Sequence, residues 1–177
     1  MSVSDKDLSI RQINYRQDQT EPSADAQQIV DIYNHYIQHS PATFDTEPFT
    51  VHSRLSWFNQ FDGEKYICLV AVQDDQIIGY ANSAKFKPKP AYGTSVEVSV
   101  YLHPDFTGQG GGKHLYRALF EHLGNQPIHR CYAGVTLPNP ASIALHQGFG
   151  FQEVGHFHEV GYKFSRYWDV AWLERAA

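Results

Sequence analysis

The 177-residue sequence predicts an α/β fold. Segments in which every second residue is apolar, as in a half-buried strand, alternate along the chain with segments of helical spacing. The clearest strand, over 95–102, runs into Pro104 and a glycine cluster, after which the clearest amphipathic helix spans 112–123. A strand that passes through a glycine-rich turn into a helix is typical of α/β proteins.

The N-terminal half is expected to hold one strand, two helices and a hairpin whose turn is Asp74–Asp75. In chain order these are a strand over 8–13, a helix over 24–39, a helix over 51–61 capped by Thr50, and hairpin strands over 66–73 and 76–84. Pro88 and Pro90 mark a loop rather than a domain linker.

The C-terminal half continues the alternation. Along 95–102, the apolar Val96, Val98, Val100 and Leu102 share one face, and the polar residues, Glu97 among them, share the other. The later elements are expected as a strand over 130–135, a short helix from Pro140 to Gly148 capped by Asn139, and strands near 151–159 and 166–173.

Length and composition restrict the class of protein. The chain has the usual size of one domain, so residues 1–177 are expected to form a single domain. A net charge of −5 gives no electrostatic case for nucleic acid or for an anionic membrane surface. Cys68 and Cys131 lie in apolar runs and are expected to be buried thiols, as suits a reducing compartment. Met1–Asp7 lacks the apolar core of a signal peptide, so the protein is expected in the cytoplasm.

The glycine cluster predicts a binding site for a phosphate-bearing ligand, because glycine turns and helix N-termini present several N–H groups to an anion. Two common phosphate-binding patterns do not fit. A P-loop would need glycine in place of Thr107 and a hydroxyl side chain in place of His114. The dinucleotide pattern G-x-G-x-x-G finds Lys113 or Leu115 at its last position.

The spacing that does fit is [QR]-x-x-G-x-[GA], with Gly110 and Gly112 at the glycine positions and Thr107 departing from the usual first residue. This pattern resembles the pyrophosphate arm of the GCN5-related N-acetyltransferases (GNAT). Further segments occur in the order of that family's phosphinothricin and methionine sulfoximine branch, namely 42–48, 96–97, 137–140, 145–151 and 161–163. The resemblance extends over about residues 8–174.

The resemblance implies a mixed, mostly antiparallel central sheet with helices on both faces, and a homodimer. It implies transfer of an acetyl group from acetyl-CoA, without a metal, to the α-amino group of phosphinothricin, methionine sulfoximine or methionine sulfone. That transfer would be direct, within a ternary complex. Two alternatives stay open: acetylation of another amine, such as a protein N-terminus or a polyamine, and a non-catalytic sensor of acyl-CoA.

Two residues are candidates for catalysis. Glu97 lies on the polar face of the strand that enters the glycine loop, and the resemblance points to the same residue as general base. Its alternative is a solvated carboxylate. His146 lies in the last turn of the short helix, where the helix dipole favours an imidazolium and so a proton donor. Its alternative is a purely electrostatic role at that helix end.

The cofactor contacts are taken from the resemblance. The backbone of Val100–Leu102 would pair with the pantetheine arm, and the loop over 108–113 would hold the pyrophosphate. Asn139 has two compatible roles, as helix cap and as contact to pantetheine, and Lys113 is either a contact or a surface lysine. The expected set is Val100, Tyr101, Leu102, Gly108, Gln109, Gly110, Gly111, Gly112, Lys113 and Asn139.

The resemblance implies an amino-acid pocket built from Phe44, Lys89, Tyr92, Glu97 and Tyr162. Lys89 stands where the branch usually has arginine, and lysine lacks the planar fork that binds an oxyanion in two places. Gly93–Thr94 replaces a bulkier pair, so the pocket is expected to be wider or its ligand different. The aromatic members have core packing as their alternative.

Other chemistries find less support in the sequence. His156 and His158 would share one face of a strand next to Glu159, but the chain has neither H-E-x-x-H nor a paired-cysteine motif, so no metal is expected. The chain also has no G-x-S-x-G elbow for a serine nucleophile.

Overall fold

The computed structural model describes residues 8–15 and 23–177, so Met1–Asp7 lies outside the described residues. The chain forms β1 (Ser9–Gln12), α1 (Ala24–His39), a 3₁₀ turn η1 (His52–Arg54), α2 (Leu55–Phe58), β2 (Cys68–Gln73), β3 (Gln76–Lys85), η2 (Pro90–Tyr92), β4 (Ser95–Leu102), η3 (Pro104–Phe106), α3 (Gly111–Leu123), β5 (Arg130–Leu137), α4 (Pro140–Gly148), β6 (Gln152–Lys163) and β7 (Arg166–Ala176).

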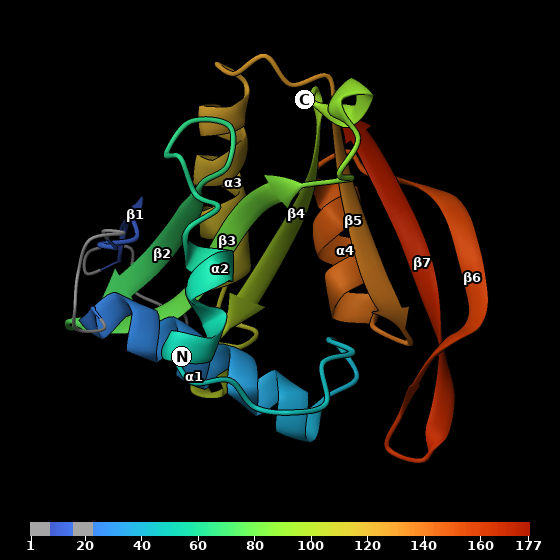
Figure 1. Ribbon diagram of the computed structural model, residues 1–177, viewed down its shortest axis with the longest axis horizontal. Helices are drawn as coiled ribbons and strands as arrows, with labels where there is room; N and C mark the ends of the chain where they lie inside the picture. Colours follow the sequence, from blue (N-terminus) through green and yellow to red (C-terminus); the bar gives the residue numbers. More distant parts are fainter. Residues whose placement is uncertain (1–7, 16–22) are drawn as a thin grey trace.

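The strands form one seven-stranded sheet in the order β1-β2-β3-β4-β5-β7-β6. Neighbours are antiparallel except β4 and β5, which are parallel. Helices lie on both faces of this sheet (Figure 1). The predicted mixed, mostly antiparallel α/β fold with helices on both faces is therefore confirmed.

The parallel pair is short, and this shapes the site. Only Ser95–Glu97 pairs with β5, opposite Arg130–Tyr132. Beyond Glu97, β4 pairs with β3 as far as Leu102, while β5 pairs with β7. The two central strands therefore diverge (Figure 1), and beyond Glu97 the β5-facing edge of β4 is no longer paired with β5.

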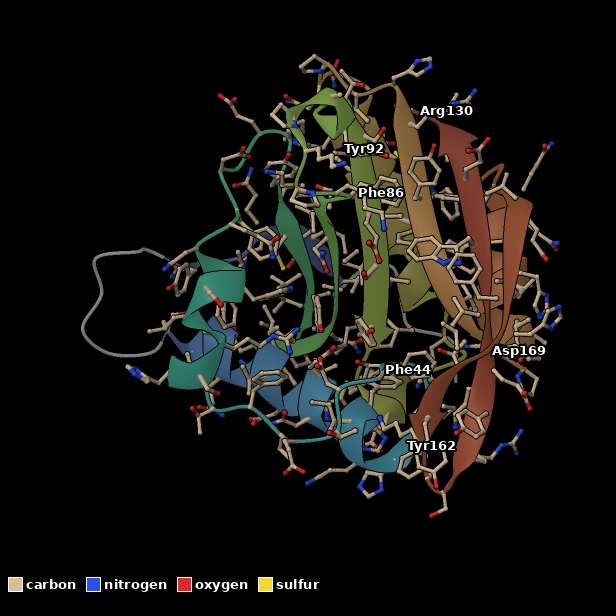
Figure 2. The ribbon with its side chains drawn as sticks, turned by 45° about the vertical axis from the view of Figure 1, so that its right-hand side comes forward. Phe44, Phe86, Tyr92, Arg130, Tyr162 and Asp169 are labelled. Atoms are coloured by element: carbon tan, nitrogen blue, oxygen red, sulfur yellow. The ribbon has the colours of Figure 1, made fainter. Side chains whose placement is uncertain are left out.

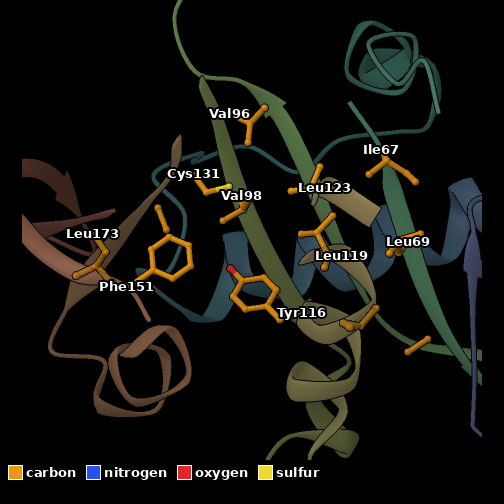
Figure 3. Packing of buried hydrophobic residues seen from close by; sticks show 14 of the residues in the cluster. Ile67, Leu69, Val96, Val98, Tyr116, Leu119, Leu123, Cys131, Phe151 and Leu173 are labelled. Carbon is orange, nitrogen blue, oxygen red and sulfur yellow. The ribbon is translucent and has the colours of Figure 1, made fainter. Parts of the chain in front are cut away.

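Two apolar cores hold the helices to the sheet. On one face, Leu115, Leu119 and Leu123 of α3 pack on β2, β3 and β4, in a cluster that includes Val96 and Val98 (Figure 3). On the other face, α1 and α2 pack on β2 and β3. Both cysteines are buried and free, as expected.

The second predicted helix is shorter than expected. In place of a helix over 51–61, the chain forms η1 and the four-residue α2. The Thr50 hydroxyl accepts a hydrogen bond from the Ser53 backbone N–H at 3.1 Å, but Phe61 N–H already bonds only three residues back, to Phe58. The Asp62 N–H then bonds to the Tyr66 carbonyl, which turns the chain away from the helix axis.

The last two strands are longer than predicted. They extend to a two-residue turn, Phe164–Ser165, in which both residues have positive φ, 53° and 59°. Such turns usually hold glycine or asparagine, so the sequence carried no signal for this one. Asp74 and Asp75, with φ of 49° and 60°, form the same kind of turn in the predicted hairpin. Within 8–15 and 23–177, no helix has the length and apolar character needed to span a membrane.

Candidate active site

A cavity of about 650 Å³ opens where β4 and β5 diverge. Its walls come from five places: the end of β4, the glycine loop with the start of α3, the middle of β5, α4, and the end of α1 with the loop after it, where Tyr36 and Ala42 lie. Of the predicted cofactor contacts, those that line it are Val100, Tyr101, Leu102, Gly108, Gly110, Gly112, Lys113 and Asn139. The structure thus brings eight of the ten predicted positions to one cavity.

The glycine loop has the backbone conformation that the sequence predicts. Gly108 and Gly110 have φ of +73° and +91°, in the region that residues with a Cβ rarely adopt. Gly110 is the N-cap of α3, and its carbonyl accepts the Lys113 N–H at 2.9 Å. The N–H groups of Gly111 and Gly112 come before this first bond and have no partner within the helix. Gly112 lines the cavity, at the positive end of the helix dipole.

Replacing Gly110 by alanine tests this loop. The substitution should destabilise the fold by about 1–2 kcal/mol, because the left-handed conformation brings a Cβ too close to the following carbonyl, and should raise the KM for acetyl-CoA several-fold. Gly148→Ala is the matched control, since Gly148 lies in α4 with open space around its Cβ position. Urea unfolding and initial rates measure both. An unchanged KM in Gly110→Ala contradicts the assigned role of the loop.

Two predicted cofactor contacts do not line the cavity. The Gln109 side chain donates to the Asp105 carbonyl at 2.9 Å, so it closes the loop on itself. Gly111 is buried, and a Cβ there would lie 3.4 Å from the Leu102 side chain.

Thr107 lines the cavity while its hydroxyl donates to the Pro104 carbonyl at 3.1 Å. Asn139 accepts from the Ser142 N–H at 3.1 Å as the N-cap of α4 and also lines the cavity.

His146 lies at the inner wall of the cavity, paired with a residue that the sequence did not single out. His146 Nε2 lies 2.9 Å from the Tyr116 hydroxyl, and its Nδ1 lies 2.8 Å from the Ser142 carbonyl. A carbonyl only accepts, so Nδ1 carries the proton and Nε2 accepts the Tyr116 O–H. Both side chains are buried, and both residues line the cavity.

The expectation that His146 is an imidazolium is wrong. Burial lowers the pKa of His146, and this outweighs the opposing hydrogen bond to Ser142. The dipole of α4 favours the charged form of this ring, but burial removes the water that would solvate the charge, and burial has the larger effect on the pKa. Burial also raises the pKa of Tyr116, so its hydroxyl keeps its proton. The pair is therefore neutral, and the hydroxyl of Tyr116 is its donor.

Glu97 lies on β4 at the last parallel pair, opposite Tyr132 of β5 and Ala84 of β3. Its neighbours Val98 and Ser99 line the cavity, although Glu97 itself does not. The side chain is half-buried, and this burial raises the pKa of Glu97 while Lys87 opposes the shift. A carboxylate with a raised pKa is a stronger base. Glu97 offers this base at the point where β4 and β5 separate.

The predicted substrate residues form two groups, neither of which lines the cavity. Figure 2 shows Tyr92 and Phe86 near one end of the sheet, and Phe44 and Tyr162 near the other. Lys89 is exposed at the start of η2. Phe44 packs so closely on β6 that a Cβ at Gly161 would overlap its ring.

Comparison with known proteins identifies the family. The model for the acetyltransferase (GNAT) family matches residues 29–151. The chain belongs to this family. The chain is 49% identical over 155 residues to a phosphinothricin N-acetyltransferase of Streptomyces coelicolor, covering 85% of this chain and 90% of that protein. It is 31% identical to an L-methionine sulfoximine/L-methionine sulfone acetyltransferase of Salmonella typhimurium, with 85% and 88% covered.

A solved structure supports the same assignment. The GNAT-superfamily phosphinothricin acetyltransferase of Sinorhizobium meliloti, in complex with acetyl-CoA, superposes with a TM-score of 0.85 at 29% identity. The alignment covers 96% of this chain and 88% of that one. The protein described here is therefore an acyltransferase by its family, and it shares the fold of the Sinorhizobium enzyme.

The acetyltransferase also has an aromatic wall, most of which the sequence does not predict. Phe86 stacks on Tyr132 with ring centroids 4.3 Å apart, and it meets Tyr92 and Trp172 edge-on. Tyr132 pairs with Glu97 across the strands, so this wall stands beside the carboxylate. Only Tyr92 was predicted, because the others are set next to one another by strand register.

Lys163 is a second feature that the sequence left unassigned. Its buried Nζ donates to the carbonyls of Thr43, Ser40 and Tyr36 at 2.7, 2.9 and 3.4 Å. Burial lowers the pKa of Lys163, while Asp45 opposes the shift. These bonds tie the end of β6 to the C-terminus of α1 and to the loop that carries Phe44, next to the cavity residues Tyr36 and Ala42.

Replacing Lys163 by methionine should lower the free energy of unfolding by about 2–3 kcal/mol, because three carbonyls lose a charged donor in a buried place. Urea denaturation measures the change. Lys65→Met is the control, since Lys65 Nζ reaches a single carbonyl, that of Gly93 at 2.6 Å, and should cost about 1 kcal/mol. Equal effects in the two variants contradict the role given to Lys163.

Proposed function

We propose that the protein transfers the acetyl group of acetyl-CoA to the α-amino group of a small amino acid analogue, with phosphinothricin, methionine sulfoximine and methionine sulfone as substrates. The observation that carries the proposal is the cavity between the diverging strands, closed at one end by a glycine loop and flanked by Glu97. The names of the 49% and 31% identical relatives support the substrate class.

The residues present fit acetyl-CoA. The free N–H groups at the start of α3 suit a pyrophosphate, and Lys113 adds a positive charge there. The backbone edge of Val100–Leu102, free of β5, suits the amides of the pantetheine arm. Asn139 lies along the same channel. Gln109 and Gly111 would contribute through the loop backbone.

Bound acetyl-CoA supplies the acetyl group as a thioester. Glu97 accepts the proton of the substrate ammonium, directly or through a water, since an α-amino group with a pKa near 8 is mostly charged at neutral pH. Free N–H groups on the β5-facing edge of β4 donate to the carbonyl oxygen, where negative charge develops. The amine then attacks directly, within a ternary complex.

Tyr116 and His146 act on the leaving sulfur. As the thiolate departs, the Tyr116 O–H turns from His146 Nε2, which positions it until then, and donates its one hydrogen bond to the sulfur. A thiol with a pKa near 8.5 is a good leaving group as its thiolate. A neutral hydrogen-bond donor is therefore enough to stabilise the negative charge that develops on sulfur, and a cationic acid is not needed. His146 is thus a positioning residue for Tyr116.

The substrate would lie on the Glu97 face of the sheet. Tyr92 borders this face at one end, with Lys89 at the start of the same η2 turn, and Phe44 and Tyr162 border it at the other. An aromatic wall gives the aliphatic chain an apolar surface, and the cations Lys87 and Lys89 attract the oxygens of a tetrahedral phosphorus or sulfur centre. These positive charges would repel a polyamine.

Thiol release from acetyl-CoA against a panel of amines tests the proposal. The panel holds phosphinothricin, methionine sulfoximine, methionine sulfone, the proteinogenic amino acids, a polyamine and an N-terminal peptide. Turnover confined to the tetrahedral analogues supports the substrate class. Turnover of another amine alone overturns it, and tight acetyl-CoA binding without any turnover favours the sensor.

We also propose a cytoplasmic homodimer in which residues 1–177 form one acetyltransferase domain. The support is apolar surface on the β6–β7 hairpin, where the exposed side chains are Val154, Phe157, Val160, Tyr162, Phe164 and Tyr167. Light scattering after gel filtration should give twice the 20.2 kDa chain mass. Tyr162→Ser with Phe164→Ser should shift the mass toward the monomer. A monomer at all concentrations in the unmodified protein contradicts the dimer.

A further inference from the structure

A cluster of metal-ligating side chains lies on the β6–β7 hairpin, away from the cavity. His156 and His158 project from β6, and Asp169 projects from β7. One ligand atom from each residue lies within 4.8 Å of the other two. The acetyl-transfer chemistry proposed above uses none of the three.

The two imidazoles converge on one carboxylate oxygen. His156 Nε2 and His158 Nδ1 lie 2.9 and 3.3 Å from Asp169 Oδ2. The two rings are stacked with centroids 4.4 Å apart and an interplanar angle of 27°, so one ring turns when both nitrogens face a single ion. Zn²⁺ binds nitrogen and oxygen at about 2.0–2.2 Å in tetrahedral geometry, which sets neighbouring ligands roughly 3.3–3.5 Å apart. The two nitrogen–oxygen separations are therefore within a few tenths of an ångström of those in a zinc site.

The groups behind these ligands are also those of a metal site. Glu153 Oε1 lies 3.6 Å from His156 Nδ1, the other ring nitrogen, which is an ion-pair distance slightly too long for a hydrogen bond. Zinc-binding histidines commonly donate their second N–H to such a carboxylate, which fixes the tautomer and strengthens the ligand. The Glu159 N–H donates to Asp169 Oδ1 at 2.7 Å, which orients the carboxylate and leaves Oδ2 for an ion.

The backbone is shaped around this contact. The β6–β7 pairing is interrupted between Phe157 and Gly161, and Glu159 within the interruption has a φ of +49°. This positive φ belongs to the residue whose N–H reaches Asp169. β6 is the edge strand, and its far end carries Lys163, whose Nζ bonds to the carbonyls of Tyr36, Ser40 and Thr43. An ion held here would join the two strands where their ladder is broken.

From these contacts we propose that His156, His158 and Asp169 bind a divalent transition-metal ion of the zinc class, with water in the remaining position. The ion is structural: it clasps β6 to β7 and takes no part in acetyl transfer. It takes the place of the proton on His156 Nε2, which passes to solvent, while Nδ1 keeps its proton on the side of Glu153, whose Oε1 lies 3.6 Å away. Imidazole and carboxylate ligands suit zinc, and a magnesium or calcium site would need more oxygen ligands.

The test is a titration of the full-length, tag-free protein with ZnCl₂ by isothermal calorimetry, after treatment with EDTA. His158→Gln removes one ligand from an exposed side chain, whose exposed fraction is 78%, so the variant should fold normally. His39→Gln is the matched control, because His35 and His39 form another close imidazole pair, on α1, with centroids 4.9 Å apart. Equal melting temperatures of all three proteins in EDTA confirm that folding is unchanged.

We expect one Zn²⁺ per chain in the unmodified protein and in His39→Gln, with at least tenfold weaker binding in His158→Gln. At free Zn²⁺ of 100 times Kd, the melting temperature should rise by roughly 5–10 °C in the first two proteins and much less in the third. Co²⁺ should give the strong visible absorption of a tetrahedral complex only where His158 is present.

Two results overturn the proposal. One is a calorimetric result: the unmodified protein does not bind Zn²⁺, or His39→Gln loses the binding while His158→Gln keeps it. The other is light scattering in which Zn²⁺ raises the mass of the unmodified protein above that of its metal-free form, while the mass of His158→Gln stays unchanged. That result would place the ligands on different molecules.

Discussion

Replacing Glu97 by glutamine should lower kcat/KM for the amine substrate by about 10²–10⁴-fold, the range that a general base contributes. Glutamine keeps the shape of the side chain and removes its ability to take a proton. Initial rates of thiol release measure the loss, and calorimetry with acetyl-CoA should show unchanged affinity. Glu121→Gln, on the exposed side of α3, is the matched control and should behave like the unmodified enzyme.

The pH dependence gives this prediction a direction. Burial raises the pKa of Glu97, so the carboxylate form is present at high pH and is lost as pH falls through that raised value. The acidic limb of kcat/KM should therefore lie above the ordinary glutamate pKa of about 4.3. Glu97→Gln should lose this limb and keep only the limb of the substrate amine. A variant within about threefold of the unmodified rate contradicts the assignment.

Replacing Tyr116 by phenylalanine should reduce kcat by about 10²-fold, as for the loss of one donor to developing charge. The KM for acetyl-CoA should change little, because the hydroxyl acts on the sulfur only as it leaves. The variant also leaves His146 Nε2 buried without its partner, which should cost about 1–3 kcal/mol of stability. Single-turnover rates and urea unfolding measure the two effects separately. Tyr15→Phe, whose hydroxyl bonds to Asn59 far from the cavity, is the control.

A double-mutant cycle with His146→Asn decides whether the two residues act together. If His146 serves to hold the Tyr116 hydroxyl, the double variant should be no slower than Tyr116→Phe alone. Losses that multiply would mean that His146 acts on the sulfur independently. That result would restore the role of proton donor that the sequence assigned to His146.

The sequence predicted the parts of the site that depend on local backbone chemistry. Gly108, Gly110 and Asn139 have conformations or capping bonds that follow from residue type and spacing alone. The strand over 95–102 was equally clear, because each apolar residue is two positions from the next. Here local and tertiary structure agree.

What the sequence could not predict depends on which strands meet. Tyr132 faces Glu97 through a parallel register of three residues, and Tyr116 meets His146 from a different helix. The burial of His146 reversed the charge state inferred from its helix position, since desolvation is a property of the packed site. The cluster around Asp169 needs both β6 and β7 in place, so two histidines on one strand looked like surface residues.

The most direct measurement is a matrix of initial rates with acetyl-CoA and phosphinothricin varied together, and with the product identified by mass spectrometry. Direct transfer in a ternary complex predicts intersecting double-reciprocal lines and N-acetylphosphinothricin as product. Parallel lines, or an acetylated enzyme trapped in the absence of the amine, would contradict the account, because the acetyl group would then pass first to a side chain.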